Sequence, residues 1–209
     1  MSTSTGDSAR HDSGLGWPRA ARWRVVDIVV AAVIAIAFGV VFWAWGQFWT
    51  VTGPAFTAFP PAQAFMYGVW LVPAVLAPLV IRRPGAAIFT ELVAALVSVL
   101  LGSPWGGFVI VYGLVEGAAG ELAFAATRYR RWNLPVALLA GGLTGIAASG
   151  LDLGYYYRTW ALTWQVTYTA LVVASCVAIA GLGSYLLVRA LARTGVLDPF
   201  PSGRAARPV

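Results

Sequence analysis

The stretch VVDIVVAAVIAIAFGVVFWAWG (25–46) decides the fold class, because it is apolar from end to end apart from Asp27. The hydrocarbon core of a bilayer is about 30 Å thick, and a helix needs about 20 apolar residues to cross it. The stretch is longer than the roughly 7–15 apolar residues of a cleavable signal sequence, and no small-residue cleavage site follows it directly. We therefore expect a retained transmembrane helix here.

Further apolar stretches of similar length follow at 64–81, 86–102, 105–127, 134–156 and 161–190. The whole chain of 209 residues is 59% hydrophobic and 11% charged, which is not typical of a water-soluble domain. The sequence predicts an all-α integral protein of the cell membrane, a bundle of six transmembrane helices over 23–193. Prolines at 73 and 78 predict a kink or local unwinding in the second stretch.

Both ends of the chain are expected to lie outside the bundle. Residues 1–22 are rich in Ser, Thr and Gly and have no apolar period, which predicts a disordered tail. Residues 194–209 are expected to form a C-terminal tail.

The arginines predict the side on which each loop lies, because short loops that carry Arg or Lys stay cytoplasmic. All fourteen basic residues are arginine, and the net charge is +6. Thirteen of them lie in the N-terminal tail, in the second and fourth loops and at the C-terminal end, whereas Arg158 lies in an intervening loop. This alternation predicts that both termini are cytoplasmic. The membrane topology therefore accounts for the positive net charge, and we expect no nucleic-acid binding.

Small residues recur every fourth position on three of the predicted helices. Such strips allow close helix contact in lipid, where the hydrophobic effect does not drive association. The strips are Ala31, Ala35 and Gly39; Gly113 and Gly117; and Gly141, Gly145 and Ser149. We expect the last two to pack within the chain, while docking to another protein is the alternative.

Carboxylates within a span cost about 2.5–3.5 kcal/mol on insertion scales and tend to face a polar interior. Glu91, Glu116 and Glu121 are such residues, whereas Asp27 and Asp152 lie nearer helix ends and are expected to be interfacial. We expect Glu91 to be structural, pairing with an arginine of a cytoplasmic loop. Glu121 lies on the Gly113/Gly117 strip and is expected to serve helix packing or an ion pair.

The fourth stretch carries an aromatic stripe that ends at a carboxylate. At about 100° per residue, Trp105, Phe108, Tyr112 and Glu116 share one face. Aromatic faces attract organic cations, and a carboxylate supplies the counter-charge, so the stripe predicts a cation site. Tyr67, Trp70, Trp45 and Trp49 are expected to line the same outer vestibule, beneath a Pro-containing loop at 47–63 that could form a lid. The alternative is an interfacial aromatic belt, with Glu116 paired to an arginine.

Several chemistries are disfavoured by what the sequence lacks. It has one cysteine, Cys176, and one histidine, His11, which are too few for a Cys/His metal site or a disulfide framework. It contains no P-loop, no HExxH and no Gly-x-Ser-x-Gly motif. We therefore expect no enzyme activity, no metal and no cofactor, and any ATP use must come from another chain.

The block from Met66 to Asn133 carries an ordered series of residues that resembles one family of membrane subunits. The series is Gly68, Trp70, Arg83-Pro84-Gly85-Ala86, Glu91, Gly102, Trp105-Gly106, Gly113, Gly117, Glu121, Phe124 and Tyr129-Arg130. It is similar to the YkoE-type substrate-binding (S) components of energy-coupling factor (ECF) transporters. The family's pattern often has glutamate where this chain has Ser98, and glutamine where it has Glu116. A carboxylate thus stands on the fourth stretch in place of one on the third.

The resemblance implies a six-helix S component that captures thiamine or its hydroxymethylpyrimidine precursor outside the cell. It further implies docking on a transmembrane coupling subunit driven by two ATPases. In S components generally, small residues of the first helix form the docking surface, which here are Ala31, Ala35 and Gly39. Older labels for the family suggest cobalt transport, but the lack of a Met/His/Cys cluster disfavours a metal ligand.

Two other functions fit the same sequence. One is a membrane scaffold that binds no small molecule and uses its small-residue strips for protein contacts. The other is a stand-alone ion-coupled carrier, which would transport its substrate without an ATPase.

Overall fold

The computed structural model describes residues 22–204, and every regular element in that range is a helix. The α-helices are α1 (Val25–Thr52), α2 (Val72–Ile81), α3 (Ala86–Leu100), α4 (Val109–Ala126), α5 (Leu134–Tyr155), α6 (Leu162–Ser175), α7 (Ser184–Arg193) and α8 (Pro201–Arg204). Short 3₁₀ helices are η2 (Gly53–Phe56), η3 (Pro60–Val69) and η4 (Gly106–Phe108), and a π-helical segment is η5 (Cys176–Gly183). The predicted tail at 1–22 lies almost wholly outside the described residues.

Five helical segments in the described chain are long and apolar enough to cross a membrane. They are Val25–Phe56, Pro60–Ile81, Gly106–Ala126, Leu134–Tyr155 and Leu162–Arg193. The stretch predicted at 86–102 forms a shorter apolar helix, α3, of 15 residues. At 1.5 Å per residue α3 is about 22 Å long, less than the hydrocarbon thickness of about 30 Å.

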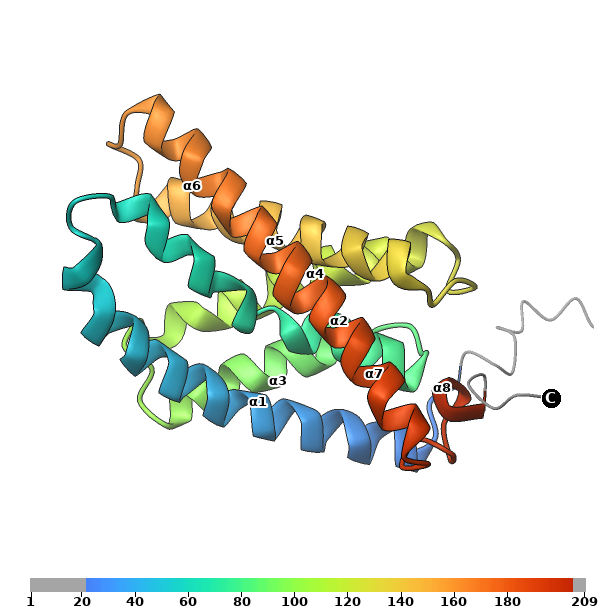
Figure 1. Cartoon of the computed structure of the whole chain (residues 1–209). Helices are drawn as coiled ribbons and strands as arrows, with labels where there is room; N and C mark the ends of the chain where they lie inside the picture. The colour runs from blue at the N-terminus through green and yellow to red at the C-terminus, as the bar shows by residue number, and fades with distance from the viewer. Residues whose placement is uncertain (1–21, 205–209) are drawn as a thin grey trace, which may run out of the picture.

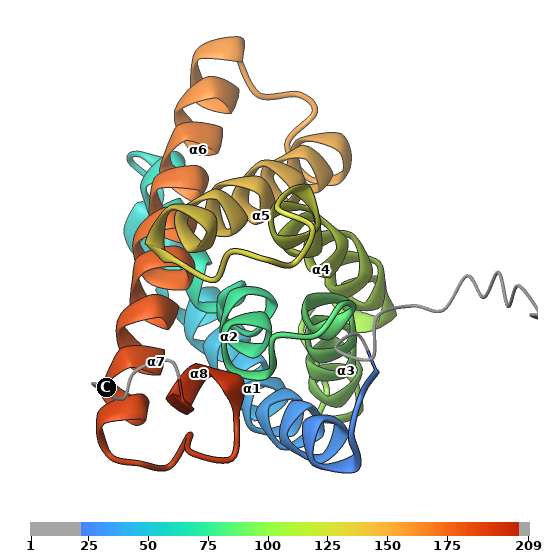
Figure 2. The same ribbon diagram turned by 90° about the vertical axis from the view of Figure 1, so that its right-hand side faces the viewer.

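Helix α2 forms the centre of the bundle. Figure 2 shows it surrounded by α1, α3, α4, α5 and α7, and each of these helices contacts it. Its residues from Pro73 to Ile81 are all buried. In Figure 1, α6, η5 and α7 form one continuous rod that crosses the bundle at an angle.

The second span is interrupted near the predicted position. The 3₁₀ helix η3 ends at Val69, and α2 begins at Val72 with Pro73 in its first turn. Proline is tolerated in a first turn because its missing N–H would have no helical partner there. Pro73 therefore helps to start a new helix.

The π-helical region of the last rod meets η3 at this interruption. The Gly68 amide donates a hydrogen bond to Ser175 Oγ at 3.0 Å, and the Ser175 hydroxyl donates to the Phe65 carbonyl at 2.7 Å. A Cβ on Gly68 would lie 2.5 Å from the Ser175 carbonyl oxygen, so the contact requires glycine. Because η3 and the rod are tied here, the aromatic residues of η3 have a fixed position.

Two of the small-residue strips pack inside the chain, as expected. A Cβ built on Gly113 would lie 2.6 Å from Ala95 Cβ, and one on Gly117 would lie 2.9 Å from Ile88 Cα, both on α3. Likewise a Cβ on Gly141 would lie 2.6 Å from the Cys176 carbonyl oxygen. These glycines allow α4 to approach α3, and α5 to approach the last rod.

The first-helix strip was expected to be a partner surface, and the structure corrects this expectation. Ala31, Ala35 and Gly39 are buried within the chain, and a Cβ on Gly39 would overlap the Val97 side chain of α3. The reason is that small residues favour close contact with any neighbouring helix, and here that helix is α3. The exposed faces of α1 carry larger residues, among them Val33 and Ile36.

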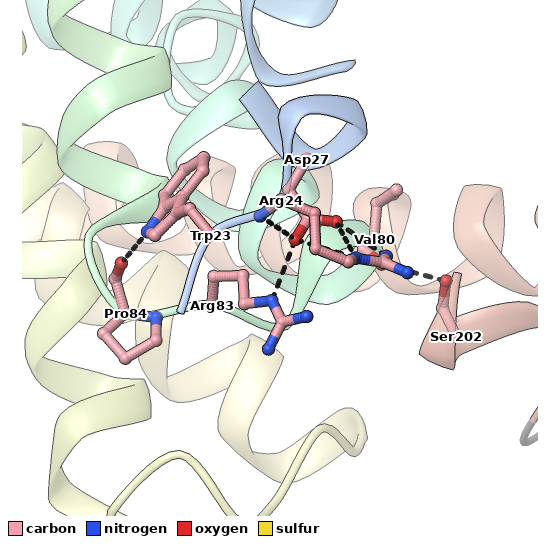
Figure 3. A network of polar contacts seen from close by, with 7 residues as sticks. All are labelled: Trp23, Arg24, Asp27, Val80, Arg83, Pro84 and Ser202. Atoms are coloured by element: carbon pink, nitrogen blue, oxygen red, sulfur yellow. Dashed lines mark hydrogen bonds and ion pairs between the residues drawn. The ribbon is translucent and has the colours of Figure 1, made fainter. Parts of the chain in front are cut away.

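Asp27 organises the arginine-rich end of the bundle (Figure 3). It accepts hydrogen bonds from the Arg24 side chain at 2.8 Å and from Arg83 Nε at 3.0 Å. Asp27 was expected to lie at the membrane interface in contact with water, but its side chain is fully buried. Nearby, the Trp23 indole donates to the Pro84 carbonyl at 2.9 Å. These contacts fix the start of α1 to the loop between α2 and α3.

The part of the predicted C-terminal tail that the structure describes folds back on the bundle. Leu197 and Phe200 are each only 5% exposed, and the Ser202 hydroxyl donates to the Val80 carbonyl at 3.0 Å. The short helix α8 contacts α2 and α7. Two apolar side chains thus anchor a segment whose composition suggested a free tail.

Candidate functional site

A cavity of about 300 Å³ lies at the end of the bundle opposite the paired arginines Arg82 and Arg83. Its walls come from α1, η3, α3, α4, α5 and α6, together with the loops that follow α3 and α5. Small-molecule sites typically measure about 300–1,000 Å³, so the cavity is at the small end of that range. It is large enough for a compact ligand.

Five of the six residues predicted to bind a ligand line this cavity. They are Glu116, Tyr112, Trp105, Trp70 and Tyr67. The aromatic stripe of the fourth stretch therefore faces the cavity, except that Phe108 packs against Tyr155 with ring centroids 4.4 Å apart.

Trp45, the sixth residue, lies outside the cavity lining. Its indole donates to the Met66 carbonyl at 2.9 Å, and its ring packs against Phe48. Helix α1 reaches the cavity through Phe42 and Trp49 instead. The sequence identified the aromatic end of α1, but it did not settle the helix rotation that selects Trp49 over Trp45.

The tryptophans of the cavity pack against one another, Trp70 edge to face with Trp105 and tilted against Trp49. Trp70 lies between Trp49, at a centroid distance of 5.1 Å, and Trp105, at 5.4 Å. Tyr67 completes the cluster at 5.3 Å from Trp70. Gly46 makes room for this wall, because a Cβ there would lie 2.8 Å from the Trp105 ring. The cluster presents a rigid aromatic surface to a planar ligand.

Three carboxylates line the same cavity: Glu91 on α3, Glu116 on α4 and Asp152 on α5. No arginine or histidine is found among the lining residues in the described range. The carboxylates are 0%, 4% and 5% exposed, respectively. A cavity with this lining can offer counter-charges to a cation and offers none to an anion.

Asp152 is the carboxylate with hydrogen-bond donors from the protein. It accepts the Tyr112 hydroxyl at 2.6 Å and the Tyr168 hydroxyl at 2.6 Å. Tyr157 lies beyond the end of α5 and also lines the cavity, and burial together with the charge of Asp152 raises the pKa of Tyr157 to about 12. Its hydroxyl remains protonated near neutral pH and can donate a hydrogen bond.

The expectation that Glu91 pairs with a loop arginine is wrong. Glu91 is fully buried at the cavity, and neither of its carboxyl oxygens has a side-chain partner or a well-aligned hydrogen bond in the described chain, although the backbone amide of Ala74 lies near them. The position of the residue near the start of α3 suggested the arginine end, but its side chain faces the cavity. A buried carboxyl group without a side-chain partner can pair with a ligand.

Glu121 is structural, as expected, although its partners are not arginines. Its two carboxyl oxygens accept the backbone amides of Gly85 at 2.6 Å and Ala87 at 2.9 Å. These amides lie at the start of α3, where helical N–H groups have no partner and the helix dipole favours a negative charge. Glu121 therefore caps α3 from α4.

Sequence reasoning missed several residues of the site. Asp152 was expected to be interfacial, although it lines the cavity. Tyr157 and Tyr168 were not considered at all. The sequence did contain a signal for these residues. Asp152 is followed closely by Tyr156 and Tyr157 at the C-terminal end of α5, and all three line the aromatic cavity.

No group of three or more His, Cys, Asp or Glu side chains in residues 22–204 is arranged to hold a metal ion. His11 lies outside the described residues. The cavity lining instead combines aromatic rings with separate carboxylates.

Three comparisons with known proteins agree on the family. A family model described as "ABC-type cobalt transport system, permease component" matches residues 26–147. A protein of Bacillus subtilis (strain 168) named "Putative HMP/thiamine permease protein YkoE" is 37% identical over 183 residues, which cover 87% of this chain and 91% of that protein. A crystal structure of an S component of an ECF transporter superposes with a TM-score of 0.83 at 37% identity, covering 88% of this chain and 93% of the other. The chain belongs to the YkoE-type family of ECF S components.

As an S component, the chain is a multi-pass protein of the cell membrane and part of a transport system. The coverage and the TM-score show that the solved S component shares most of the helical bundle described above.

Proposed function

We propose that this S component captures thiamine, or a related pyrimidine, at the outer face of the cell membrane for uptake. The observation that supports the proposal best is the aromatic cavity with Glu91, which has no side-chain partner, and neighbouring Glu116 in its wall. The Bacillus subtilis relative is named for hydroxymethylpyrimidine (HMP) and thiamine. Thiamine combines an aminopyrimidine ring with a permanently charged thiazolium ring, which suits both features of the cavity.

The proposed roles of the lining residues follow from their chemistry. Glu116 serves as the counter-charge for the thiazolium ring, in a setting where a cation and a carboxylate interact strongly. Trp70, Trp105 and Trp49 offer ring faces and edges for stacking. Glu91 accepts hydrogen bonds from the aminopyrimidine, which would supply the well-aligned donors that its oxygens lack.

The orientation of the chain is part of the proposal. Thirteen of fourteen arginines fall in the tails and in alternate loops of the sequence, which favours six crossings with both termini in the cytoplasm. The aromatic cavity is at the end opposite Arg82 and Arg83 and would open to the outside. The shorter helix α3 can still complete a crossing if its flanking loops lie within the membrane but are covered by neighbouring helices.

Uptake requires further subunits in this proposal. The S component performs no chemistry itself and delivers its ligand to a transmembrane coupling subunit driven by ATPases. Because Ala31, Ala35 and Gly39 are buried, the coupling subunit must use another surface of the bundle.

Calorimetric titration of the purified full chain tests the proposal directly. Thiamine should bind with micromolar affinity or better, HMP should bind more weakly because it lacks the thiazolium charge, and Co²⁺ should neither bind nor displace thiamine. If neither thiamine nor HMP binds, the proposal is wrong and a scaffold function is favoured. If the reconstituted chain transports thiamine without an ATPase, it is a stand-alone carrier.

A further inference from the structure

A second cavity lies at the arginine-rich end of the bundle and plays no part in the proposed capture of thiamine. Its volume is about 390 Å³, and it lies between α2, α7, α8 and the loop that precedes α5. Three arginines, two aromatic residues and a serine give it its chemical character. They are Arg82, Arg189, Arg193, Trp132, Tyr185 and Ser202.

The three arginines lack acidic partners within the described range. Both ion pairs found there use Asp27, with Arg24 and Arg83 as its partners. The cavity lining contains no Asp or Glu. A concentration of positive charge without carboxylates favours the binding of an anion.

Arg82 is the most constrained of the three. Its Nε is buried and has no hydrogen-bond partner, and burial lowers the pKa of its guanidinium. Its backbone is left-handed, with φ of 55°, because Arg82 ends α2 and its amide donates to the Pro78 carbonyl at 2.8 Å. A desolvated guanidinium whose Nε lacks a partner, in the wall of a cavity, is in the position expected for a group that contacts a ligand.

Helix α7 supplies the other two arginines on one face. Arg189 and Arg193 are four residues apart, so their side chains are neighbours on the helix surface. Arg189 lies over the Tyr185 ring at 5.9 Å, which orients the guanidinium beside the cavity. Two adjacent guanidinium groups can bind the oxygens of one phosphate through paired hydrogen bonds.

The surface next to the cavity is suited to an acyl chain. Leu182 and Leu186 precede Arg189 and Arg193 by two helical turns on the same side of the rod, and they are 38% and 52% exposed. Along the rod, these two leucines lie farther from its C-terminal end than the two arginines do. A lipid whose phosphate is among the arginines could therefore lay its chain along these leucines.

We propose that this arginine cavity binds a phosphate group, carried by an anionic phospholipid of the adjacent leaflet or by a soluble phosphate compound. The phosphate oxygens accept hydrogen bonds from Arg82, Arg189 and Arg193. Trp132 and Ser202 line the same cavity. The site is independent of the aromatic cavity, so its failure would leave the proposed transport function untouched.

Native mass spectrometry of the purified full chain tests the site. The protein is offered equal amounts of phosphatidylglycerol and phosphatidylcholine, and the retained adducts are compared. We expect phosphatidylglycerol to be retained preferentially, and the double variant Arg189→Gln/Arg193→Gln to reduce its retention about tenfold. Both arginines are exposed in the chain alone, so the double variant should fold.

A matched control removes the same charge from the same end of the bundle. Arg130 and Arg131 lie in the exposed loop between α4 and α5 and do not line the cavity. Arg130→Gln/Arg131→Gln should change retention less than about twofold, because long-range charge alone is screened by salt within about 10 Å.

The source of the phosphate is decided by a second arm, in which inorganic phosphate is added to protein in neutral detergent. Stabilisation at millimolar phosphate that is lost in Arg189→Gln/Arg193→Gln, without a preference for phosphatidylglycerol, assigns the site to a soluble phosphate. A lipid preference without that stabilisation assigns it to the membrane. The proposal is overturned if neither ligand is preferred, or if both double variants lose binding equally.

Discussion

Asp152 on α5 accepts the hydroxyl of Tyr112 on α4 at a distance of 2.6 Å. The other oxygen of Asp152 accepts the Tyr168 hydroxyl of α6 at the same distance, so one carboxylate joins three helices at the aromatic cavity. Short bonds of this kind to an ionised acceptor are among the strong hydrogen bonds of proteins. Asp152 thereby organises the cavity, and Glu116 and Glu91 are left to interact with a ligand.

Replacing Tyr112 with Phe should destabilise the bundle. The change removes one charge-assisted hydrogen bond from Asp152, and the expected loss in the free energy of unfolding is about 1.5–3 kcal/mol. Thermal unfolding in detergent measures it. Tyr155→Phe is the control, because Tyr155 is exposed and its contacts are ring contacts that phenylalanine keeps. Equal melting temperatures for the two variants would contradict the role given to the Tyr112–Asp152 bond.

Glu121→Gln should lower stability without changing ligand affinity. The glutamine amide turns an N–H₂ group toward one of the two backbone amides that Glu121 now accepts, at Gly85 and Ala87. We expect a loss of about 1–3 kcal/mol in unfolding free energy. Glu121 does not line the aromatic cavity, so thiamine affinity of the folded protein should stay within about twofold. A large loss of affinity at unchanged stability would show that Glu121 belongs to the binding site.

Ala35→Leu should impair folding more than partner binding. Ala35 is fully buried in the chain, and a larger side chain must displace its packed neighbours at a cost of about 1–3 kcal/mol. Val40→Leu is the control on the same helix, because Val40 is 48% exposed. Thermal unfolding and co-purification with the coupling subunit are measured together. Normal stability of Ala35→Leu with loss of the coupling subunit would restore the strip as an interface.

The pair Trp49→Phe and Trp45→Phe tests which face of α1 meets the ligand. Trp49 lines the cavity and packs on Trp70, whereas Trp45 is outside the lining and donates to Met66. Thiamine should quench the fluorescence of Trp45→Phe as it does that of the native protein, and its affinity for Trp49→Phe should fall about three- to thirtyfold. The reverse pattern would place the ligand on the other face of α1.

Hydropathy and arginine placement predicted most of the helical boundaries, because membrane insertion depends on length and composition. The same reasoning could not detect that α3 ends at Leu100, since the apolar run continues into the loop that follows it. Nor could it foresee that Leu197 and Phe200 pack back on the bundle. Two apolar residues in a polar segment are too weak a signal.

For the site, the periodicity of α4 was sufficient to place Tyr112 and Glu116 on one face. The residues from α5 and α6 were missed because the rotation of those helices depends on tertiary packing. Asp152 near a helix end resembles an interfacial residue until Tyr112 and Tyr168 are seen to meet it. The partner of Glu91 was misjudged for the same reason.

The proposed role of Glu116 as counter-charge is tested most directly by titrating Glu116→Gln with thiamine and with HMP. Glutamine keeps the shape of the side chain and removes its charge. Thiamine affinity should fall at least about tenfold, while the affinity for neutral HMP should change less than about threefold. Unchanged thiamine affinity, or equal losses for the two ligands, would contradict the account.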